Sequence, residues 1–128
     1  MNTASQGMAS PYLDPDTQAE IEDMMDGDQE MVIDLIDTMT EAAPELLAEL
    51  QAGIQTGEAK RISDAAHALK SSAAQLGALP FSRLCLQLEQ WGKAADVAAA
   101  RHIQADIEPA FQHMIQALQA WKQALRRA

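Results

Sequence analysis

The apolar residues between positions 58 and 77 follow the spacing of one face of an α-helix. Five of them recur at steps of three and four residues: Ile62, Ala66, Leu69, Ala73 and Leu76. At about 100° per residue, His67 lies roughly 150° from the centre of this stripe, so its side chain is predicted to face water. The pattern predicts a helix over residues 58–77 that ends at Gly77.

Apolar stripes of the same kind predict four more helices, over residues 14–25, 29–51, 80–92 and 96–126. In the first, the residues expected to be buried are Ile21, Met24 and Met25. The stripe of the helix over residues 29–51 consists of Met31, Leu35, Met39, Ala42, Leu46 and Leu50, flanked by Val32, Ile36, Ala43 and Leu47. The stripe of the helix over residues 80–92 consists of Phe81, Leu84, Cys85, Leu88 and Trp91. In the last, Pro109 is expected to break or kink the helix near residues 105–108.

The links between these helices are short, which favours antiparallel neighbours. We therefore predict an all-α protein, an antiparallel up-down four-helix bundle with an additional short N-terminal helix across one end. Residues 1–11 lack such a pattern and are expected to form a flexible tail, which leaves residues 12–128 as a single domain. The composition agrees, since hydrophobic residues make up 48% of the chain and aromatic residues only 4%.

The net charge of −10 is spread unevenly along the chain. Residues 1–59 hold 14 acidic side chains and no Lys or Arg, whereas residues 60–128 hold nine basic and five acidic side chains. An acidic chain argues against a nucleic-acid partner. A local positive field around His67, suited to a phosphoryl group or an acidic partner, is predicted from Lys60, Arg61, Lys70, Arg83 and Lys93.

No apolar run is long enough to span a bilayer, and the first residues do not resemble a signal peptide. The one cysteine, Cys85, cannot form an internal disulfide, which fits a reducing compartment. We expect a cytoplasmic protein with no membrane partner.

The neighbours of His67 on its own side of the predicted helix are small. Ser63 and Ser71 lie four residues before and after it, and Ala74 lies seven residues after it. Lys70 is close enough to reach a group attached to the ring. A neutral imidazole nitrogen can attack a phosphoryl group, and an adjacent ammonium group offsets the added negative charge. By spacing alone, however, a lone surface histidine is more often an ordinary solvated residue.

Two runs of residues add a more specific signal. The first is His67-Ala68-Leu69-Lys70-Ser71-Ser72 with the following Leu76-Gly77, and the second is Phe81-Ser82-Arg83-Leu84-Cys85-Leu86-Gln87-Leu88-Glu89. Together they resemble the motif of histidine-containing phosphotransfer (HPt) domains, specifically within residues 65–93 and more loosely over residues 13–125. Ser71 departs from the family pattern, which often has glycine at this position, but serine is still small and should leave His67 accessible.

The resemblance implies a phosphorelay intermediate in two-component signalling. His67 would accept a phosphoryl group from a receiver-domain aspartate and pass it to another response regulator. Around the histidine, Lys70 would stabilise the phosphoryl group, Ser71 and Ser72 would donate hydrogen bonds to it, Glu89 would orient the ring, and Lys93 would be a second cation. The residues expected to contact a partner are Ser63, Ala74, Ala78 and Leu86.

The implied partners are response-regulator receiver domains and a hybrid histidine kinase. The sequence has no glycine-rich phosphate loop and no kinase signature, so we expect no autonomous kinase activity. No cofactor is expected, because the magnesium ion used in transfer would belong to the receiver domain. One core is enough for a protein of this length, which favours a monomer.

Alternatives to phosphotransfer stay open at this point. The chain could be a non-catalytic docking or adaptor bundle that binds receiver domains without carrying phosphate. A metal site is not expected, because His67, His102 and His113 lack paired spacing and no Glu-x-x-His pattern is present. Cys85 lies on the apolar face of its helix, where a packed thiol is more common than a nucleophile.

Overall fold

The computed structural model describes residues 10–127, so most of the tail predicted at residues 1–11 lies outside the described residues. Within residues 10–127 there are six α-helices and no strand. Their bounds are α1 Pro15–Met24, α2 Gln29–Thr56, α3 Ala59–Gln75, α4 Leu79–Lys93, α5 Val97–His102 and α6 Gln104–Arg127. The predicted all-α class is confirmed.

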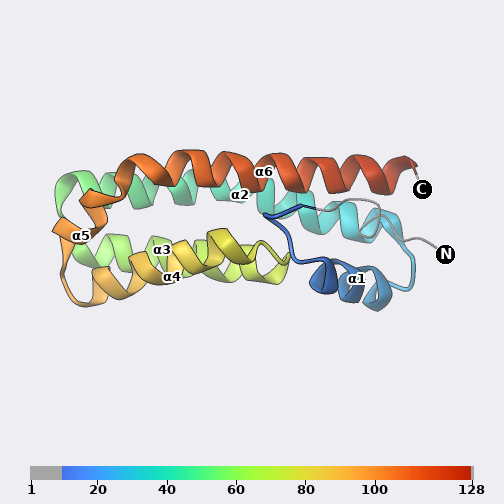
Figure 1. The fold of residues 1–128 in the computed structure, drawn as a ribbon, viewed down its shortest axis with the longest axis horizontal. Helices are drawn as coiled ribbons and strands as arrows, with labels where there is room; N and C mark the ends of the chain where they lie inside the picture. Colours follow the sequence, from blue (N-terminus) through green and yellow to red (C-terminus); the bar gives the residue numbers. More distant parts are fainter. Residues whose placement is uncertain (1–9, 128) are drawn as a thin grey trace.

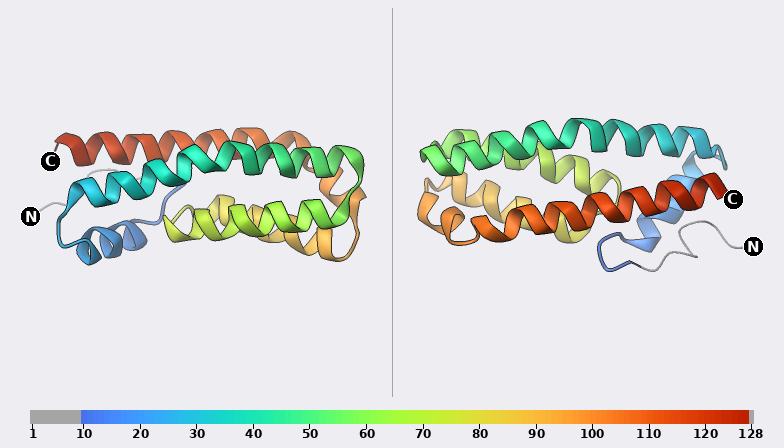
Figure 2. Two further views of the ribbon diagram at one scale, coloured as in Figure 1. Left: turned by 180° about the vertical axis from the view of Figure 1, so that it is seen from behind. Right: turned by 90° about the horizontal axis from the view of Figure 1, so that it is seen from above.

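The helices α2, α3, α4 and α6 run alternately in opposite directions along one axis (Figure 1). With 28 and 24 residues, α2 and α6 are about 42 and 36 Å long, whereas the 17 residues of α3 span only about 25 Å. The long helices therefore extend beyond one end of the α3–α4 pair, and α1 lies beside the protruding part of α2 (Figures 1 and 2). At the opposite end, α5 crosses from α4 to α6.

The N-terminus of α1 is fixed by Asp14 and Pro15, as the sequence pattern indicates. The Asp14 carboxylate accepts hydrogen bonds from the backbone N–H and the hydroxyl of Thr17, and Pro15 occupies the first turn. Ile21 is buried, but Met24 is 78% exposed and Met25 only partly buried, which contradicts the prediction for Met24. The helix is too short to bury more than a narrow face.

The buried face of α2 is rotated from the predicted stripe. Met31 and Ala42 are exposed, whereas Met39 and Leu50 of the predicted stripe are buried. The rest of the core side consists of Val32, Ile33, Ile36, Ala43, Leu47 and Ile54. The rotation follows from the neighbours of α2, which packs against both α3 and α6. The helix also continues past the predicted end at residue 51 until Gly57, which adopts a left-handed conformation with φ of 77°.

The predicted helix over residues 96–126 is in fact two helices, α5 and α6, separated at Ile103. The Arg101 side chain donates hydrogen bonds to the carbonyl oxygens of Ile54 and Gln55, at the C-terminal end of α2. These bonds hold α5 across the end of the bundle, so the chain must turn before it can enter α6. Pro109, the residue expected to break the helix, lies inside α6.

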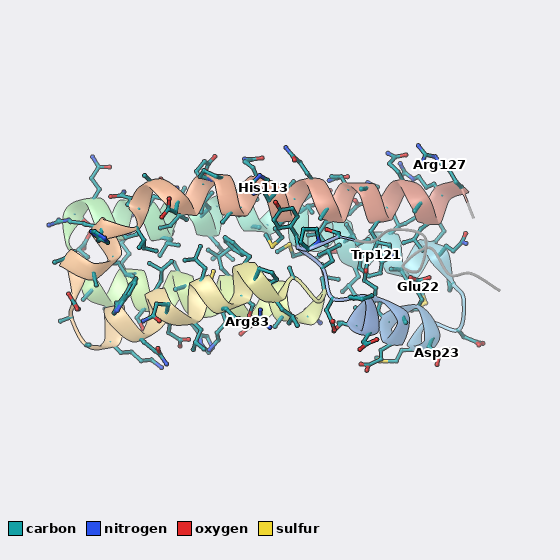
Figure 3. All side chains as sticks on the ribbon, in the orientation of Figure 1. Glu22, Asp23, Arg83, His113, Trp121 and Arg127 are labelled. Atoms are coloured by element: carbon teal, nitrogen blue, oxygen red, sulfur yellow. The ribbon has the colours of Figure 1, made fainter. Side chains whose placement is uncertain are left out.

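The core extends through the whole bundle, and several of its largest side chains are fully buried: Ile36, Leu50, Ile62, Leu69, Leu88, Leu118 and Trp121. The Trp121 indole of α6 donates a hydrogen bond to the Glu22 carboxylate of α1 at 3.3 Å, which joins α1 to the bundle (Figure 3). Cys85 is buried as expected. None of the helices in residues 10–127 is both long enough and apolar enough to cross a membrane.

Candidate functional site

The α3 and α4 helices lie side by side in antiparallel directions (Figures 1 and 2). Three contacts define their register. Gly92 lies against Ser63, the Glu89 side chain meets His67, and the Ser82 hydroxyl donates a hydrogen bond to the Lys70 carbonyl oxygen at 3.1 Å. This register brings side chains from two sequence-distant motifs to one place on the surface.

His67 lies in the middle of α3 and points outward, which confirms the prediction from the hydrophobic pattern. Its side chain is 62% exposed, although the imidazole is held at one of its two nitrogens. The ring Nδ1 lies 2.8 Å from Glu89 Oε2, a normal hydrogen-bond distance. The imidazole is therefore both accessible and oriented.

Glu89 is a nearly buried carboxylate, with a side chain only 5% exposed. One of its oxygens accepts a hydrogen bond from Lys70 Nζ at 2.6 Å, and the other contacts His67 and, at 3.2 Å, Lys93 Nζ. These contacts lower the pKa of Glu89 to about 2, and the hydrogen bond from Lys70 contributes most. Burial of the carboxylate acts in the opposite direction and raises the pKa. Glu89 is consequently ionised at neutral pH.

The ionised Glu89 determines which ring nitrogen of His67 carries hydrogen. A carboxylate can only accept a hydrogen bond, so Nδ1 of His67 must be the donor in their 2.8 Å contact. In a neutral imidazole the lone pair then lies on Nε2. The site therefore presents Nε2 as a nucleophile.

The charges at the site sum to a small positive value. Two ammonium groups, Lys70 and Lys93, surround the single Glu89 carboxylate, which leaves one net positive charge when the imidazole is neutral. Lys70 is mostly buried, whereas the Lys93 side chain is 68% exposed. The two cations therefore differ in how freely they can move toward a group bound to the ring.

The wider positive field predicted around His67 is largely neutralised. Lys60 pairs with Asp64 at 2.8 Å, and Arg61 pairs with Glu49 and Glu58 at 2.9 and 3.0 Å. Glu49 belongs to α2, so its pairing with Arg61 depends on the packing of α2 against α3 rather than on local sequence. Of the other predicted cations, Lys70 and Lys93 contact Glu89 beside the histidine, and Arg83 is exposed on α4.

The structure places the other predicted site residues in two groups. Ser71 and Ala74 are exposed on α3, Ser72 is partly buried, and Leu86 is 41% exposed on α4. Ser63 and Ala78, which were predicted from the sequence to be partner contacts, are buried, so little of either residue is exposed for a partner to contact. Ser63 is covered by Gly92 of α4, and Ala78 is packed in the core just before α4 begins.

The remaining histidines lie apart from this site. His102 is the last residue of α5. His113 lies on α6 (labelled in Figure 3), and its ring stacks on that of Tyr12 with ring centroids 4.8 Å apart. In residues 10–127, no group of three or more His, Cys, Asp or Glu side chains is placed to hold a metal ion.

Two positions important for the site went unrecognised in the sequence. Gly92 and Ser82 contact α3 on either side of the His67–Glu89 pair. A glycine inside a helix is a recognisable signal of close packing. Which helix it approaches, however, depends on the register of α3 against α4.

The fold and the site define a helical bundle that presents an oriented imidazole to solvent. The family model of the Hpt domain matches residues 34–121, a range that contains His67, Lys70, Glu89 and Lys93. The chain therefore belongs to the Hpt domain family, and it is a phosphorelay intermediate in two-component signalling.

A comparison with solved structures supports the fold. The chain is similar to the crystal structure of histidine-containing phosphotransfer protein B (HptB) from Pseudomonas aeruginosa PAO1, with a TM-score of 0.77 and 24% sequence identity. The similarity covers 94% of this chain and 99% of that chain. The comparison with curated proteins finds no match.

Proposed function

We propose that Nε2 of His67 accepts a phosphoryl group from the aspartate of one response-regulator receiver domain and donates it to another. The observation that carries this proposal is the 2.8 Å contact between Nδ1 of His67 and the ionised Glu89. It leaves the lone pair on Nε2 of a ring that is otherwise open to solvent.

The transfer step exchanges one bond to phosphorus for another. The Nε2 lone pair attacks the phosphorus atom of the aspartyl phosphate, the P–N bond forms, and the P–O bond to the aspartate breaks with release of its carboxylate. Nδ1 keeps its hydrogen, and the negative charge of Glu89 offsets the positive charge that develops on the ring. Attack by the carboxylate of a second receiver domain reverses the step.

The surrounding side chains stabilise the bound phosphoryl group. Lys70 and Lys93 supply ammonium groups, and we assign the hydroxyls of Ser71 and Ser72 the role of hydrogen-bond donors to phosphoryl oxygens. The stabilisation is modest because the site is open to water and shares its cations with Glu89. A relay needs such balance, since it must release the group as readily as it accepts it.

Ala74 on α3 and Leu86 on α4, both exposed, are the proposed contacts with the receiver domain. We assign no autonomous kinase activity and no resident cofactor to the chain, which would receive its phosphoryl group through a hybrid histidine kinase. It would act in the cytoplasm as a monomeric domain over residues 12–128, without nucleic-acid or membrane partners.

A transfer assay with a panel of receiver domains, phosphorylated on aspartate, tests the proposal. Wild type and His102→Gln, the control for an exposed histidine outside the site, should become labelled, whereas His67→Gln should not. Label that persists in His67→Gln would contradict the assignment. Receiver binding without label on the wild type would favour the docking-adaptor function, and label from ATP alone would reveal a kinase activity.

A further inference from the structure

Gly92 lies at the closest approach of α4 to α3. A Cβ atom at this position would lie 2.7 Å from the backbone nitrogen of Ser63, 2.9 Å from its Cβ and 2.9 Å from the carbonyl oxygen of Ala59. Two of these atoms belong to the α3 backbone, so no flexible side chain can move aside. Any side chain at residue 92 must push the two helices apart or rotate them.

The same contact lies one helical turn from the His67–Glu89 pair. Gly92 follows Glu89 by three residues on α4, and Ser63 precedes His67 by four residues on α3. A displacement at Gly92 is therefore transmitted along both helices to the Glu89 carboxylate. Its hydrogen bonds, at 2.8 Å to His67 and 2.6 Å to Lys70, weaken over a few tenths of an ångström.

We propose that Gly92 is a positioning residue for the phosphoacceptor histidine. Its missing side chain sets the α3–α4 separation at which Glu89 reaches Nδ1 of His67 and fixes the hydrogen there. Gly92 touches no reacting atom and acts through Glu89. The consequence for transfer rests on the proposed function of His67, whereas the consequence for the ring tautomer does not.

The matched control is Gly53, a glycine inside α2 that faces the other side of α3. A Cβ atom there would lie 3.1 Å from the backbone nitrogen of Ile62 and 3.2 Å from the Arg61 Cβ. Both Gly92→Ala and Gly53→Ala replace a buried helical glycine and crowd α3 near the same turn. Only Gly92→Ala disturbs the α3–α4 distance.

The first readout is the ring-nitrogen NMR spectrum of His67, which distinguishes the two neutral tautomers without any receiver domain. Wild type and Gly53→Ala should show hydrogen on Nδ1, whereas Gly92→Ala should show a mixture of the Nδ1–H and Nε2–H forms. An unchanged Nδ1–H spectrum in folded Gly92→Ala would overturn the proposal. If Gly92→Ala does not fold, the same spectrum is recorded for Ser63→Val, whose branched side chain crowds the same contact from α3 and should give the same mixture of tautomers.

The second readout is the rate of phosphoryl transfer, compared with the variant Glu89→Gln. Gly92→Ala should lose about tenfold in rate, the order of effect that one hydrogen bond produces, and Gly53→Ala should lose little. In the Glu89→Gln background, Gly92→Ala should cause no further loss, because its effect passes through Glu89. If the rate losses of Gly92→Ala and Glu89→Gln multiply in the double variant, the proposal that Gly92 acts through Glu89 is wrong. A wild type that accepts no label would refute the function of His67 but leave the tautomer test valid.

Discussion

Lys70 Nζ lies 2.6 Å from Glu89 Oε1, so the ammonium group that is expected to meet a phosphoryl group is already paired with a carboxylate. Phosphoryl oxygens must compete with Glu89 for this cation. Lys93, 3.2 Å from the other oxygen of the same carboxylate, can keep part of the charge of Glu89 balanced when Lys70 turns toward the ring. Before phosphorylation, both ammonium groups are therefore paired with Glu89, and each can be drawn toward a phosphoryl group on the ring.

The contribution of Lys70 to transfer can be measured with Lys70→Gln, which removes the charge but keeps a polar side chain. A hydrogen bond to a charged group contributes about 1.5–3 kcal/mol. If the phosphoryl group gains that interaction mainly in the transition state, transfer should slow by about 10- to 150-fold. Lys60→Gln, which breaks an exposed pair with Asp64 outside the site, is the control and should transfer at the wild-type rate. Equal rates in both variants would exclude Lys70 from the reaction.

Stability at acidic pH should report on the ionised Glu89. Its pKa is lowered from 4.5 to about 2 in the folded protein, so its interactions stabilise the fold fully above pH 4.5 and are lost as the pH falls toward 2. Urea unfolding of wild type and Glu89→Gln over this range isolates the contribution. The difference in unfolding free energy between the two proteins should shrink as the pH falls.

Other carboxylates also titrate in this range and must be separated from Glu89. The contacts of Glu49 with Arg61 lower the pKa of that carboxyl group, so Glu49→Gln serves as the control for a surface ion pair. Its pH-dependent effect should be smaller, because exposed pairs contribute little. A pH-independent difference between wild type and Glu89→Gln would contradict the assignment of Glu89 as the stabilising ion.

Leu86 should contribute to receiver binding rather than to the chemical step. It is 41% exposed and lies three residues before Glu89 on α4. Leu86→Ala should raise the receiver concentration needed for half-maximal transfer several-fold, up to about tenfold, while the maximal rate changes little. Met24→Ala removes a more exposed side chain, on α1, and should change neither quantity. A lower maximal rate for Leu86→Ala alone would place this residue in the reaction instead.

Cys85 should be chemically silent in the folded protein. Burial raises the pKa of its thiol to about 12, so almost no reactive thiolate is present at neutral pH. Mass spectrometry after treatment with iodoacetamide should show no adduct on the native protein and one on the urea-unfolded protein. Rapid modification under native conditions would show that α4 opens easily.

Local sequence signals were sufficient to predict the outward direction of His67 and most of the helices, but not the division into α5 and α6. The three- and four-residue spacing of Ile62, Ala66 and Leu69 determines which side of α3 is buried, whatever its neighbours. The Asp14–Pro15 pair likewise marks the start of α1 by local chemistry. These features need no knowledge of tertiary contacts.

Local sequence signals did not predict the features that depend on contacts between two helices. The buried side of α2 could not be located without knowing that α3 and α6 both pack on it, and Met31 was therefore misplaced. The small size of Ser63 suggested an open surface, but the absent side chain of Gly92 lets α4 cover it. The contact of Glu89 with His67 also depends on helix register, and only the resemblance to HPt domains, not local spacing, led us to expect it.

The most direct test of the central assignment is to locate the phosphoryl group on the ring. The protein is labelled by a phosphorylated receiver domain, kept at alkaline pH, and analysed by mass spectrometry and by ³¹P and ¹⁵N NMR. We predict one phosphoryl group on Nε2 of His67, because Nδ1 is held by Glu89. A phosphoryl group on Nδ1, or on any other residue, would contradict the assignment.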